Sequence, residues 1–367
     1  MKKTKIKIFD LSEQYHQIEK EVNLNVINIL KSGQYILGDN VSRLETKFSK
    51  VVGSKYAVSC NSGTDALILS LRALDIGPND EVITTPFTYF ATAEAIALVG
   101  AKPIFVDINP HTFNINHKNI EKLITKKTKA IMPVHLFGQS AEIVEIKKIC
   151  KLYKIKLIED CAQSFGAKKT NQYTGTFGDF GCFSFFPTKN LGCAGDGGII
   201  ITNSNTKMKV LKKLRNHGGV IRNVHDYIGY NSRLDEIQAS ILLTKMKIIK
   251  KITAARIKIA STYKKFIDNE MIKLPYQSDD AHHVYNQFTI KVKKRNKFIE
   301  HLNSYDIPYG IYYPIPIYKQ KAMAKYKYSY KLFNTEKITK ECISLPIYPE
   351  MNNDTIEYIS DVINKYK

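Results

Sequence analysis

The chain lacks any long apolar segment. Its apolar stretches are short and interrupted by polar residues, as in Ala93–Gly100, and none approaches the roughly 20 residues that a membrane-spanning helix needs. The amino end, beginning Met1-Lys2-Lys3, is basic but has neither the apolar core nor the cleavage site of a secretory signal. These absences argue against a membrane or secreted protein, so we expect a cytoplasmic one.

Cysteine pairs and metal-binding histidine patterns are also absent. The six cysteines include no Cys-x-x-Cys pair, and most of them lie inside apolar strand or helix patterns. The nine histidines show no spacing typical of metal ligands. We therefore expect reduced, buried thiols and no metal, rather than a zinc centre or a disulfide framework.

Acidic residues are scarce relative to basic ones. The 55 lysines and arginines outnumber the 34 aspartates and glutamates, which gives a formal net charge of +21. Such an excess suggests nucleic-acid binding, because phosphate affinity is largely electrostatic. However, the basic residues are mainly lysines along helix faces, as in Lys245–Lys251, and no known DNA-binding motif is present. We expect no nucleic-acid partner; the charge would instead favour capture of a small polyanionic substrate.

Short apolar strands alternate with amphipathic helices through most of the chain. This alternation predicts an α/β fold with a mostly parallel sheet that is covered by helices on both faces. The predicted strands of this sheet are Glu81–Thr84, Lys102–Asp107, Ala130–His135, Lys156–Glu159, Gly181–Phe186 and Gly198–Thr202. No crossover helix separates the last two strands, which is compatible with an antiparallel pair.

The length of 367 residues is typical of about two domains. We assign residues 1–245, with an amino-terminal arm, to a large domain and residues 246–367 to a smaller α+β domain. Helices are predicted at Ile18–Leu30, Val41–Val51, Asp65–Leu74, Ile143–Tyr153, about Asp235–Phe266, Lys297–Tyr305 and Ile356–Tyr366, and a further strand at Val284–Val292. The segment Tyr318–Tyr330, rich in tyrosine and lysine, is interpreted as a surface connection.

Asp160 and Lys189 are the strongest candidates for chemistry. Each lies just past the carboxyl end of a predicted strand, the edge where ligands collect in such sheets. A carboxylate that keeps a pyridinium nitrogen protonated and a lysine that forms a Schiff base are the parts needed to hold pyridoxal 5'-phosphate (PLP). The glycines after Lys189, up to Gly198, would let the backbone pass close to a bound ring, but they precede a strand and make no dinucleotide fingerprint.

Three further positions suit the same cofactor. Gly63 and Thr64 stand at the start of a predicted helix, where free N–H groups bind anions, and together with Ser184 they could form a phosphate cup. Tyr89 follows a strand and could stack on the ring. Gln163 could reach the phenolic oxygen of the ring. Taken singly, each has a plainer explanation, namely a helix N-cap for the first group and a core aromatic for Tyr89.

These motifs together resemble the DegT/DnrJ/EryC1/StrS family of sugar aminotransferases, PLP enzymes of the aspartate aminotransferase fold (fold type I). The resemblance covers nearly the whole chain and is carried by the segments Gly77–Ile83, Pro133–Gln139, Glu159–Ser164, Cys182–Gly192, Gly229–Gln238 and Ser344–Pro349. It implies that Lys189 is the Schiff-base lysine and Asp160 the pyridinium partner. It also implies that Asn231 reaches the phosphate of a neighbouring subunit's cofactor, in a homodimer with shared sites.

The resemblance also implies a reaction. Glutamate would donate its amine, and the acceptor would be a keto carbon, C3 by similarity, of a nucleotide-linked sugar used for polysaccharide or other glycan precursors. Arg233, Tyr312 and Tyr313 would face this sugar, although the family usually has histidine where this chain has Tyr312. Amination at C4 or of a cyclitol ketone stays open, as does a non-catalytic regulatory relative that binds nucleic acid.

Overall fold

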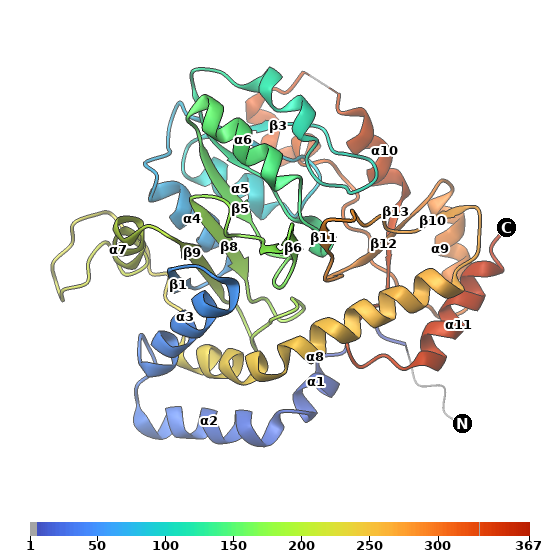
Figure 1. Cartoon of the computed structure of the whole chain (residues 1–367), viewed down its shortest axis with the longest axis horizontal. Helices are drawn as coiled ribbons and strands as arrows, with labels where there is room; N and C mark the ends of the chain where they lie inside the picture. The colour runs from blue at the N-terminus through green and yellow to red at the C-terminus, as the bar shows by residue number, and fades with distance from the viewer. Residues whose placement is uncertain (1–5, 330) are drawn as a thin grey trace.

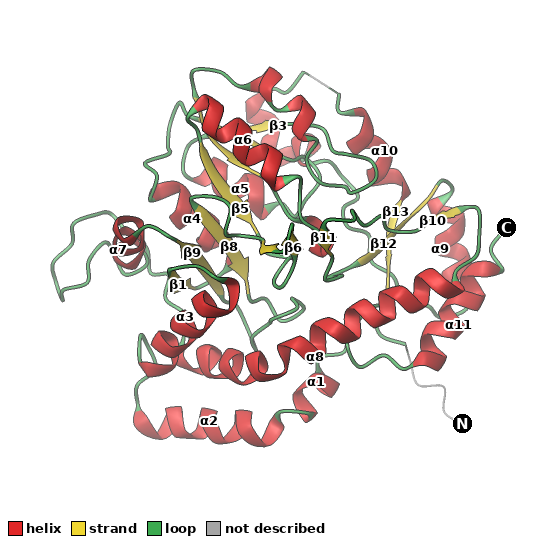
Figure 2. Ribbon diagram, in the orientation of Figure 1, coloured by secondary structure: helices red, strands yellow, loops and turns green. Residues whose placement is uncertain are grey.

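The computed structural model describes residues 6–329 and 331–367, and a seven-stranded sheet lies at its centre (Figures 1 and 2). In spatial order its strands are β1 (Tyr56–Cys60), β9 (Gly198–Thr202), β8 (Phe180–Ser184), β5 (Lys156–Asp160), β4 (Thr128–Met132), β2 (Glu81–Thr84) and β3 (Lys102–Phe105). Within this sheet only β9 runs against its neighbours. The mostly parallel α/β sheet and the antiparallel β8–β9 pair are both confirmed.

Helices cover both faces of this sheet, because successive strand residues point to opposite sides and both sides are apolar. Val82 and Ile200 belong to a core with α4 (Gly63–Arg72), α5 (Ala91–Leu98) and α7 (Asn205–Leu214). Their neighbours Ile83 and Ile199 face the other side. There α6 (Ile143–Tyr153) packs near Ile83, and α3 (Asp39–Val52) packs near Ile199 together with α8 (Glu236–Phe266).

The long helix α8 connects the two parts of the chain (Figure 1). Its first half contributes Leu242 and Met246 to the large core, whereas Ile259 and Tyr263 in its second half belong to a separate core. That second core is built on the antiparallel sheet β10 (Ile272–Lys273), β12 (Phe288–Val292) and β13 (Cys342–Leu345), with α9 (Arg295–Asn303) and α11 (Asn353–Asn364). A boundary at residue 245 would fall inside α8 and stays a prediction.

The remaining elements lie outside these two main cores. They are α1 (Ser12–His16), α2 (Glu19–Ser32), α10 (Phe333–Glu341), the small sheet of β6 (Lys168–Lys169), β7 (Gln172–Tyr173) and β11 (Ala281–His282), and short 3-10 turns such as Ile317–Lys319 and Lys321–Tyr326. α2 packs on α8 through Ile18 and Val22. No helix in the described part of the chain combines the length and apolarity that a membrane crossing requires.

The predicted helices are all present, with ends within a few residues, but some strand bounds were wrong. The strand expected at Val284–Val292 starts only at Phe288, because Val284 and Asn286 donate their N–H groups to Gly138 and Phe137 of the large domain. The strand expected at Ala130–His135 ends at Met132, before Pro133, which has no N–H to donate. Strand β1 and helices α5, α7 and α10 were not predicted.

The interpretation of Tyr318–Tyr330 as a surface connection holds for its many exposed residues but was wrong for Tyr318 and Met323. Ile317, Tyr318 and Met323 are buried against Phe105 of β3. The hydroxyl of Tyr328 donates to the carbonyl oxygen of Pro103 at 2.5 Å. Tyr330 itself lies outside the described residues. The six cysteines, in contrast, are free and buried as predicted.

The carboxylate of Glu236, at the start of α8, caps the amino end of α3. It accepts hydrogen bonds from the N–H groups of Asn40 and Val41 and from the Asn40 amide, each at 2.9 Å. These N–H groups belong to the first turn of α3, where a helix offers them no internal acceptor. Glu236 itself is only 2% exposed.

We predict that Glu236→Ala lowers the free energy of unfolding by about 2–3 kcal/mol, because buried donors lose a charged acceptor. Urea unfolding followed by circular dichroism would measure the change. The control is Glu357→Ala on the exposed face of α11, which should stay within about 0.5 kcal/mol of the unmodified chain. Equal losses in the two variants would contradict the capping role.

Candidate active site

Asp160 ends β5 with its side chain buried, 4% exposed. Its Oδ1 accepts the N–H of Ala162 at 3.1 Å, and its Oδ2 accepts the hydroxyl of Thr92 at 2.8 Å. Burial raises the pKa of this carboxyl, while those two hydrogen bonds and the charges of Lys189 and His135 oppose the rise. Two donors do not saturate a carboxylate, so Asp160 retains acceptor capacity for a cationic group.

Lys189 lies in the loop after β8 and is half-buried. Burial lowers the pKa of its amine to about 8, and the nearby Asp160 carboxylate acts in the opposite direction. At pH 7 about one amine in ten is then neutral, a far larger share than for an ordinary lysine with a pKa near 10.4. A larger neutral share makes Lys189 a better nucleophile. Asp160 and Lys189 also influence each other's ionisation.

Asn190 fixes the lysine loop to the small domain. Its amide donates to the carbonyl of Val284 at 3.1 Å and accepts from the Asn286 amide at 3.0 Å. Both asparagines are buried. Neither was identified from the sequence, since an asparagine next to a lysine carries no signal until the distant partner is known.

The amino end of α4 meets β8 as the phosphate-cup hypothesis requires. A Cβ on Gly63 would lie 2.6 Å from the Cβ of Ser184, so only glycine permits this approach. Ser62 is the N-cap and accepts the N–H of Asp65 at 3.0 Å. The N–H groups of Gly63 and Thr64 have no carbonyl acceptor inside the helix and remain suited to an anion.

Gly198, the last glycine of the run after Lys189, packs against the loop that begins α4. A Cβ on Gly198 would lie 2.3 Å from the carbonyl oxygen of Ser62 and 2.9 Å from the nitrogen of Gly63. Gly198 therefore allows β9 to pack directly against the loop that begins α4. The expectation that these glycines let the backbone pass close to a bound ring stays a prediction.

Tyr89 and Gln163 both lie next to Tyr313. Tyr89 is 63% exposed, so the core-aromatic alternative does not hold; Phe87, two residues earlier, is the buried ring. The rings of Tyr89 and Tyr313 are 6.4 Å apart. Gln163 accepts the N–H of Phe137 at 2.7 Å and donates through Nε2 to the Tyr313 hydroxyl at 3.0 Å, which leaves its second Nε2 hydrogen for another acceptor.

Tyr312 and Tyr313 approach this site from the carboxyl-terminal part of the chain. Their rings are 5.9 Å apart, and both pack on the cluster that contains Phe87 and Phe137. Burial raises the pKa of both phenols, so both are neutral donors at physiological pH. The predicted sugar contacts Tyr312 and Tyr313 therefore stand beside the predicted cofactor contacts.

Asn231 and Arg233 flank Ser232, whose hydrogen bonds attach this segment to the start of α4, beside Gly63 and Thr64. Ser232 donates to Asp65 of α4 at 2.6 Å and accepts the N–H of Asn61 at 3.3 Å. Asn231 is exposed, and Arg233 donates to the Asn216 side chain at 3.0 Å. In the part of the chain that the structure describes, neither residue forms a hydrogen bond or an ion pair with Lys189 or Tyr313 of the same chain.

A buried group of His135, Glu159 and Cys161 has the composition of a metal site but not the free ligand atoms. The Nδ1 of His135 accepts the N–H of Ala141 at 3.0 Å, and its Nε2 lies 3.0 Å from Glu159. Three backbone N–H groups, from residues 175, 177 and 178, donate to the same carboxylate. These atoms are already committed to structural hydrogen bonds.

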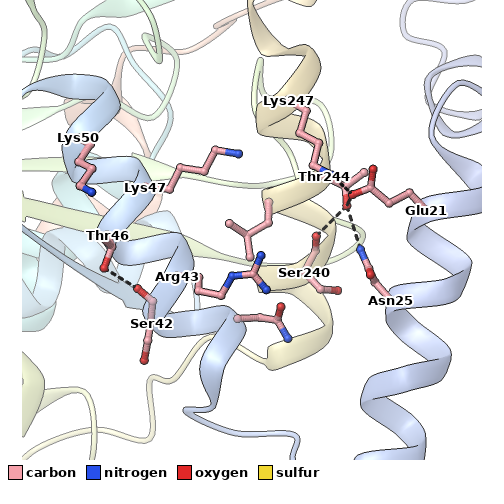
Figure 3. Close-up of a pocket in the computed structure, with 12 residues that line it drawn as sticks. Glu21, Asn25, Ser42, Arg43, Thr46, Lys47, Lys50, Ser240, Thr244 and Lys247 are labelled. Carbon is pink, nitrogen blue, oxygen red and sulfur yellow. Dashed lines mark hydrogen bonds and ion pairs between the residues drawn. The ribbon is translucent and has the colours of Figure 1, made fainter.

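A hollow with a basic lining lies away from these residues, between α2, α3 and α8 (Figure 3). We call it the basic hollow; its volume is about 580 Å³, and its cations are Arg43, Lys47, Lys50 and Lys247. Lys247 pairs with Glu21 at 2.7 Å. None of its lining residues belongs to the site around Lys189.

The residues around Lys189 fit PLP. The glycine-lined cup suits a phosphate, the exposed ring of Tyr89 suits a flat heterocycle, and the buried Asp160 requires a cationic partner. Together with the seven-stranded sheet, they define a PLP-dependent enzyme of fold type I.

The model of the DegT/DnrJ/EryC1/StrS aminotransferase family matches residues 16–364, and the chain belongs to that family. It is 41% identical over 365 residues, 98% of either chain, to a "Pleiotropic regulatory protein" of Geobacillus stearothermophilus. It is also 41% identical over 354 residues, 96% of this chain and 98% of the other, to the UDP-2-acetamido-2-deoxy-3-oxo-D-glucuronate aminotransferase of Pseudomonas aeruginosa.

Solved structures agree with this assignment. DesV of S. venezuelae superposes with a TM-score of 0.96 at 32% identity, over 99% of this chain and 98% of that one. NtdA of Bacillus subtilis, solved with its bound cofactor PMP, gives a TM-score of 0.92 at 29% identity, over 99% of this chain and 85% of that one. The chain is accordingly a PLP-dependent aminotransferase, and PLP is its cofactor.

The lowered pKa of Lys189 predicts how the apo-protein takes up PLP. The rate of covalent attachment should rise about tenfold per pH unit up to about pH 8 and then level, because only the neutral amine attacks an aldehyde. Stopped-flow absorbance between pH 6 and pH 10 would follow the reaction. A rate that continues to rise through pH 10, as for an exposed lysine, would show that Lys189 is not desolvated.

Proposed function

We propose that this chain transfers the amine of glutamate to the C3 keto carbon of a nucleotide-linked sugar, and that it does so in the cytoplasm. The observation that carries the proposal is the buried Asp160 beside a lysine whose pKa is lowered. The name of the Pseudomonas aeruginosa relative, a 3-oxo-glucuronate aminotransferase, supports a nucleotide sugar and C3. The names of further relatives, transaminases of dTDP-linked 3-amino sugars, support the same carbon.

Bound PLP supplies an electron-withdrawing ring that carries an amine from one substrate to the other. The geometry described above supports the following proposed roles. Gly63, Thr64 and Ser184 would hold the phosphate, and Tyr89 would cover one face of the ring. Asp160 would keep the ring nitrogen protonated, and Gln163, held in place by Tyr313, would donate to the ring oxygen.

Lys189 would move the proton. Once its Nζ is no longer covalently attached, the neutral amine can take a proton from the reacting carbon of the substrate and return it on the other side of the transfer. A pKa near 8 suits a base that must both accept and release a proton close to neutral pH. The hydrogen bond from Asn190 to Val284 would fix the position of the lysine loop relative to the carboxyl-terminal part of the chain.

Substrate recognition would come from Arg233, Tyr312 and Tyr313. The guanidinium of Arg233 suits a phosphate or carboxylate of the nucleotide sugar, and the two phenols suit sugar hydroxyls. A neutral phenol at 312 in place of histidine can donate one hydrogen bond but carries no positive charge.

A homodimer with shared sites would complete the arrangement. The loop that follows α7 projects away from the body of the subunit (Figure 1). It exposes a run of apolar side chains, Val220, Ile221, Val224, Tyr227 and Ile228, each 44% to 88% accessible. Apolar surface of this kind marks an interface, and Asn231 at the end of the loop is exposed and free to reach a partner's phosphate cup.

The reaction predicts the behaviour of Lys189→Ala. The unmodified protein should show a visible absorbance band with PLP and should aminate a keto sugar with glutamate; the variant should lose the covalent band and at least about a thousandfold of kcat, since it lacks both nucleophile and base. A panel of 3-keto and 4-keto nucleotide sugars, with NMR to locate the new C–N bond, would fix the carbon. A protein that takes up no PLP would reject the proposal, whereas amination only at C4 would correct its regiochemistry.

Sharing of sites predicts complementation between two inactive variants. Lys189→Ala and Asn231→Ala, co-expressed with different tags, should form mixed dimers that contain one fully native site, so about a quarter of the unmodified activity should return under random 1:2:1 assembly. Each variant expressed alone is the control. If Asn231 served its own subunit's site, both sites of the mixed dimer would be damaged and no activity would return.

A second candidate, a regulatory protein that binds nucleic acid, is favoured by the name of the Geobacillus relative and by the basic hollow (Figure 3). Arg43, Lys47 and Lys50 lie along one face of α3, and among the described residues no ion pair neutralises them. Specific DNA binding that survives Lys189→Ala but is lost in Arg43→Ser/Lys47→Ser would support this function.

A further inference from the structure

The carboxylate of Asp160 is the end of a short chain of hydroxyl groups. Thr92 Oγ1 donates to Asp160 Oδ2 at 2.8 Å, and Thr88 Oγ1 lies 3.3 Å from Thr92 Oγ1. A hydroxyl has one hydrogen to donate. Because Thr92 uses its hydrogen on Asp160, Thr88 must be the donor of the second bond, and the chain runs from Thr88 through Thr92 to Asp160.

Both threonines are removed from water. Thr88 is 4% exposed and Thr92 is 1% exposed. A hydrogen bond in such surroundings is stronger than one in water, and consecutive hydroxyl bonds polarise one another in the same sense. The donor that reaches Asp160 is therefore a neutral group whose effect on the carboxylate does not depend on its own ionisation.

The same turn carries the exposed ring of Tyr89. The N–H of Thr92 donates to the carbonyl of Tyr89 at 3.3 Å, at the start of α5. One turn of chain thus presents a ring toward the cofactor site and, three residues later, a hydroxyl toward the carboxylate beneath it. A change in the position of this turn would alter both contacts together.

We propose that Thr92, oriented by Thr88, is a positioning residue that keeps the Asp160 carboxylate ionised and directed at the ring nitrogen of PLP. The proposal rests on the role assigned to Asp160 above. It adds a function to two residues that the sequence analysis did not identify. Their effect on the cofactor passes entirely through one carboxylate oxygen.

Other ionisable groups surround Asp160 and must be held constant. Lys189 faces it from the loop after β8, His135 from the loop after β4 and Tyr313 from the carboxyl-terminal part of the chain. Cys161 follows it directly after β5, and Cys182 lies beside it on β8. Burial raises the pKa of Asp160, and the Thr92 bond is among the contacts that lower it. Removal of the hydroxyl therefore favours the protonated carboxyl, and the loss of carboxylate grows as the pH falls.

The test is the dissociation constant of PLP, measured by fluorescence titration of apo-protein from pH 5.5 to pH 9 in three threonine variants. Thr92→Val, which keeps the shape but removes the hydroxyl, should weaken PLP binding roughly 10- to 100-fold near pH 7, the range expected for a hydrogen bond to a charged group. The ratio to the unmodified protein should shrink toward high pH. Thr92→Ser should stay within about threefold at every pH, and Thr88→Val should show a smaller weakening with the same pH trend.

Asp160→Asn separates this proposal from the assignment on which it depends. It should weaken PLP binding without the pH trend, because an amide does not titrate in this range; if it binds PLP as tightly as the unmodified protein, the assignment of Asp160 itself is wrong. A loss in Thr92→Val that is equal at every pH, or a loss of the same size in Thr92→Ser, would overturn the positioning role. If Thr92→Val does not fold by circular dichroism, Thr88→Val decides, and an unchanged pH profile there would overturn the proposal.

Discussion

A carboxylate that is withdrawn from water at the end of a parallel strand is the constraint on which this site depends. An unpaired buried carboxylate is costly, and among the described residues Asp160 accepts hydrogen bonds from two neutral donors, Ala162 and Thr92. Its remaining stabilisation comes from the Lys189 amine, and it would come more fully from a protonated ring nitrogen. The same burial lowers the pKa of Lys189, so one feature, the low polarity of the sheet edge, prepares both the electrostatic partner and the nucleophile.

The second requirement is that the large core and the core built on β10, β12 and β13 hold fixed positions around this edge. Phe137 provides part of the connection, because its N–H orders Gln163 while its carbonyl accepts the N–H of Asn286 from the small domain. Gln163 in turn donates to Tyr313. The side-chain amide of Gln163, which is expected to contact the cofactor, therefore binds Tyr313, which is expected to contact the sugar. Displacement of the second core would disturb both Gln163 and Tyr313. This is a physical reason for the irregular segment 284–286 to form hydrogen bonds with Phe137 and Gly138 instead of pairing as a strand.

The sequence predicted the sheet domain well because its signals are local. Apolar strands such as Glu81–Thr84 and the helix-start glycine Gly63 are visible in runs of a few residues, and Asp160 and Lys189 stand just past such strands. The features that were missed depend on distant partners. β1 has little alternation and becomes a strand only by pairing with β9, about 140 residues later. The strand expected from Val284 failed because Gly138 and Phe137 take its first donors, and the buried position of Tyr318 depends on Phe105.

The net charge suggests nucleic-acid binding, whereas the site around Lys189 indicates catalysis. Because the two features lie apart, each bears on its own function independently. The basic hollow and the site around Lys189 share no residue, so the excess of lysine carries no information about the chemistry at Asp160. Surface cations cost little and are compatible with many functions. A buried carboxylate with unfilled acceptor capacity beside a lysine of lowered pKa is costly for folding and typical of catalytic sites. A protein that only bound nucleic acid would gain nothing from that cost, so the enzymatic function is the better account of these residues even if the basic hollow binds a polyanion.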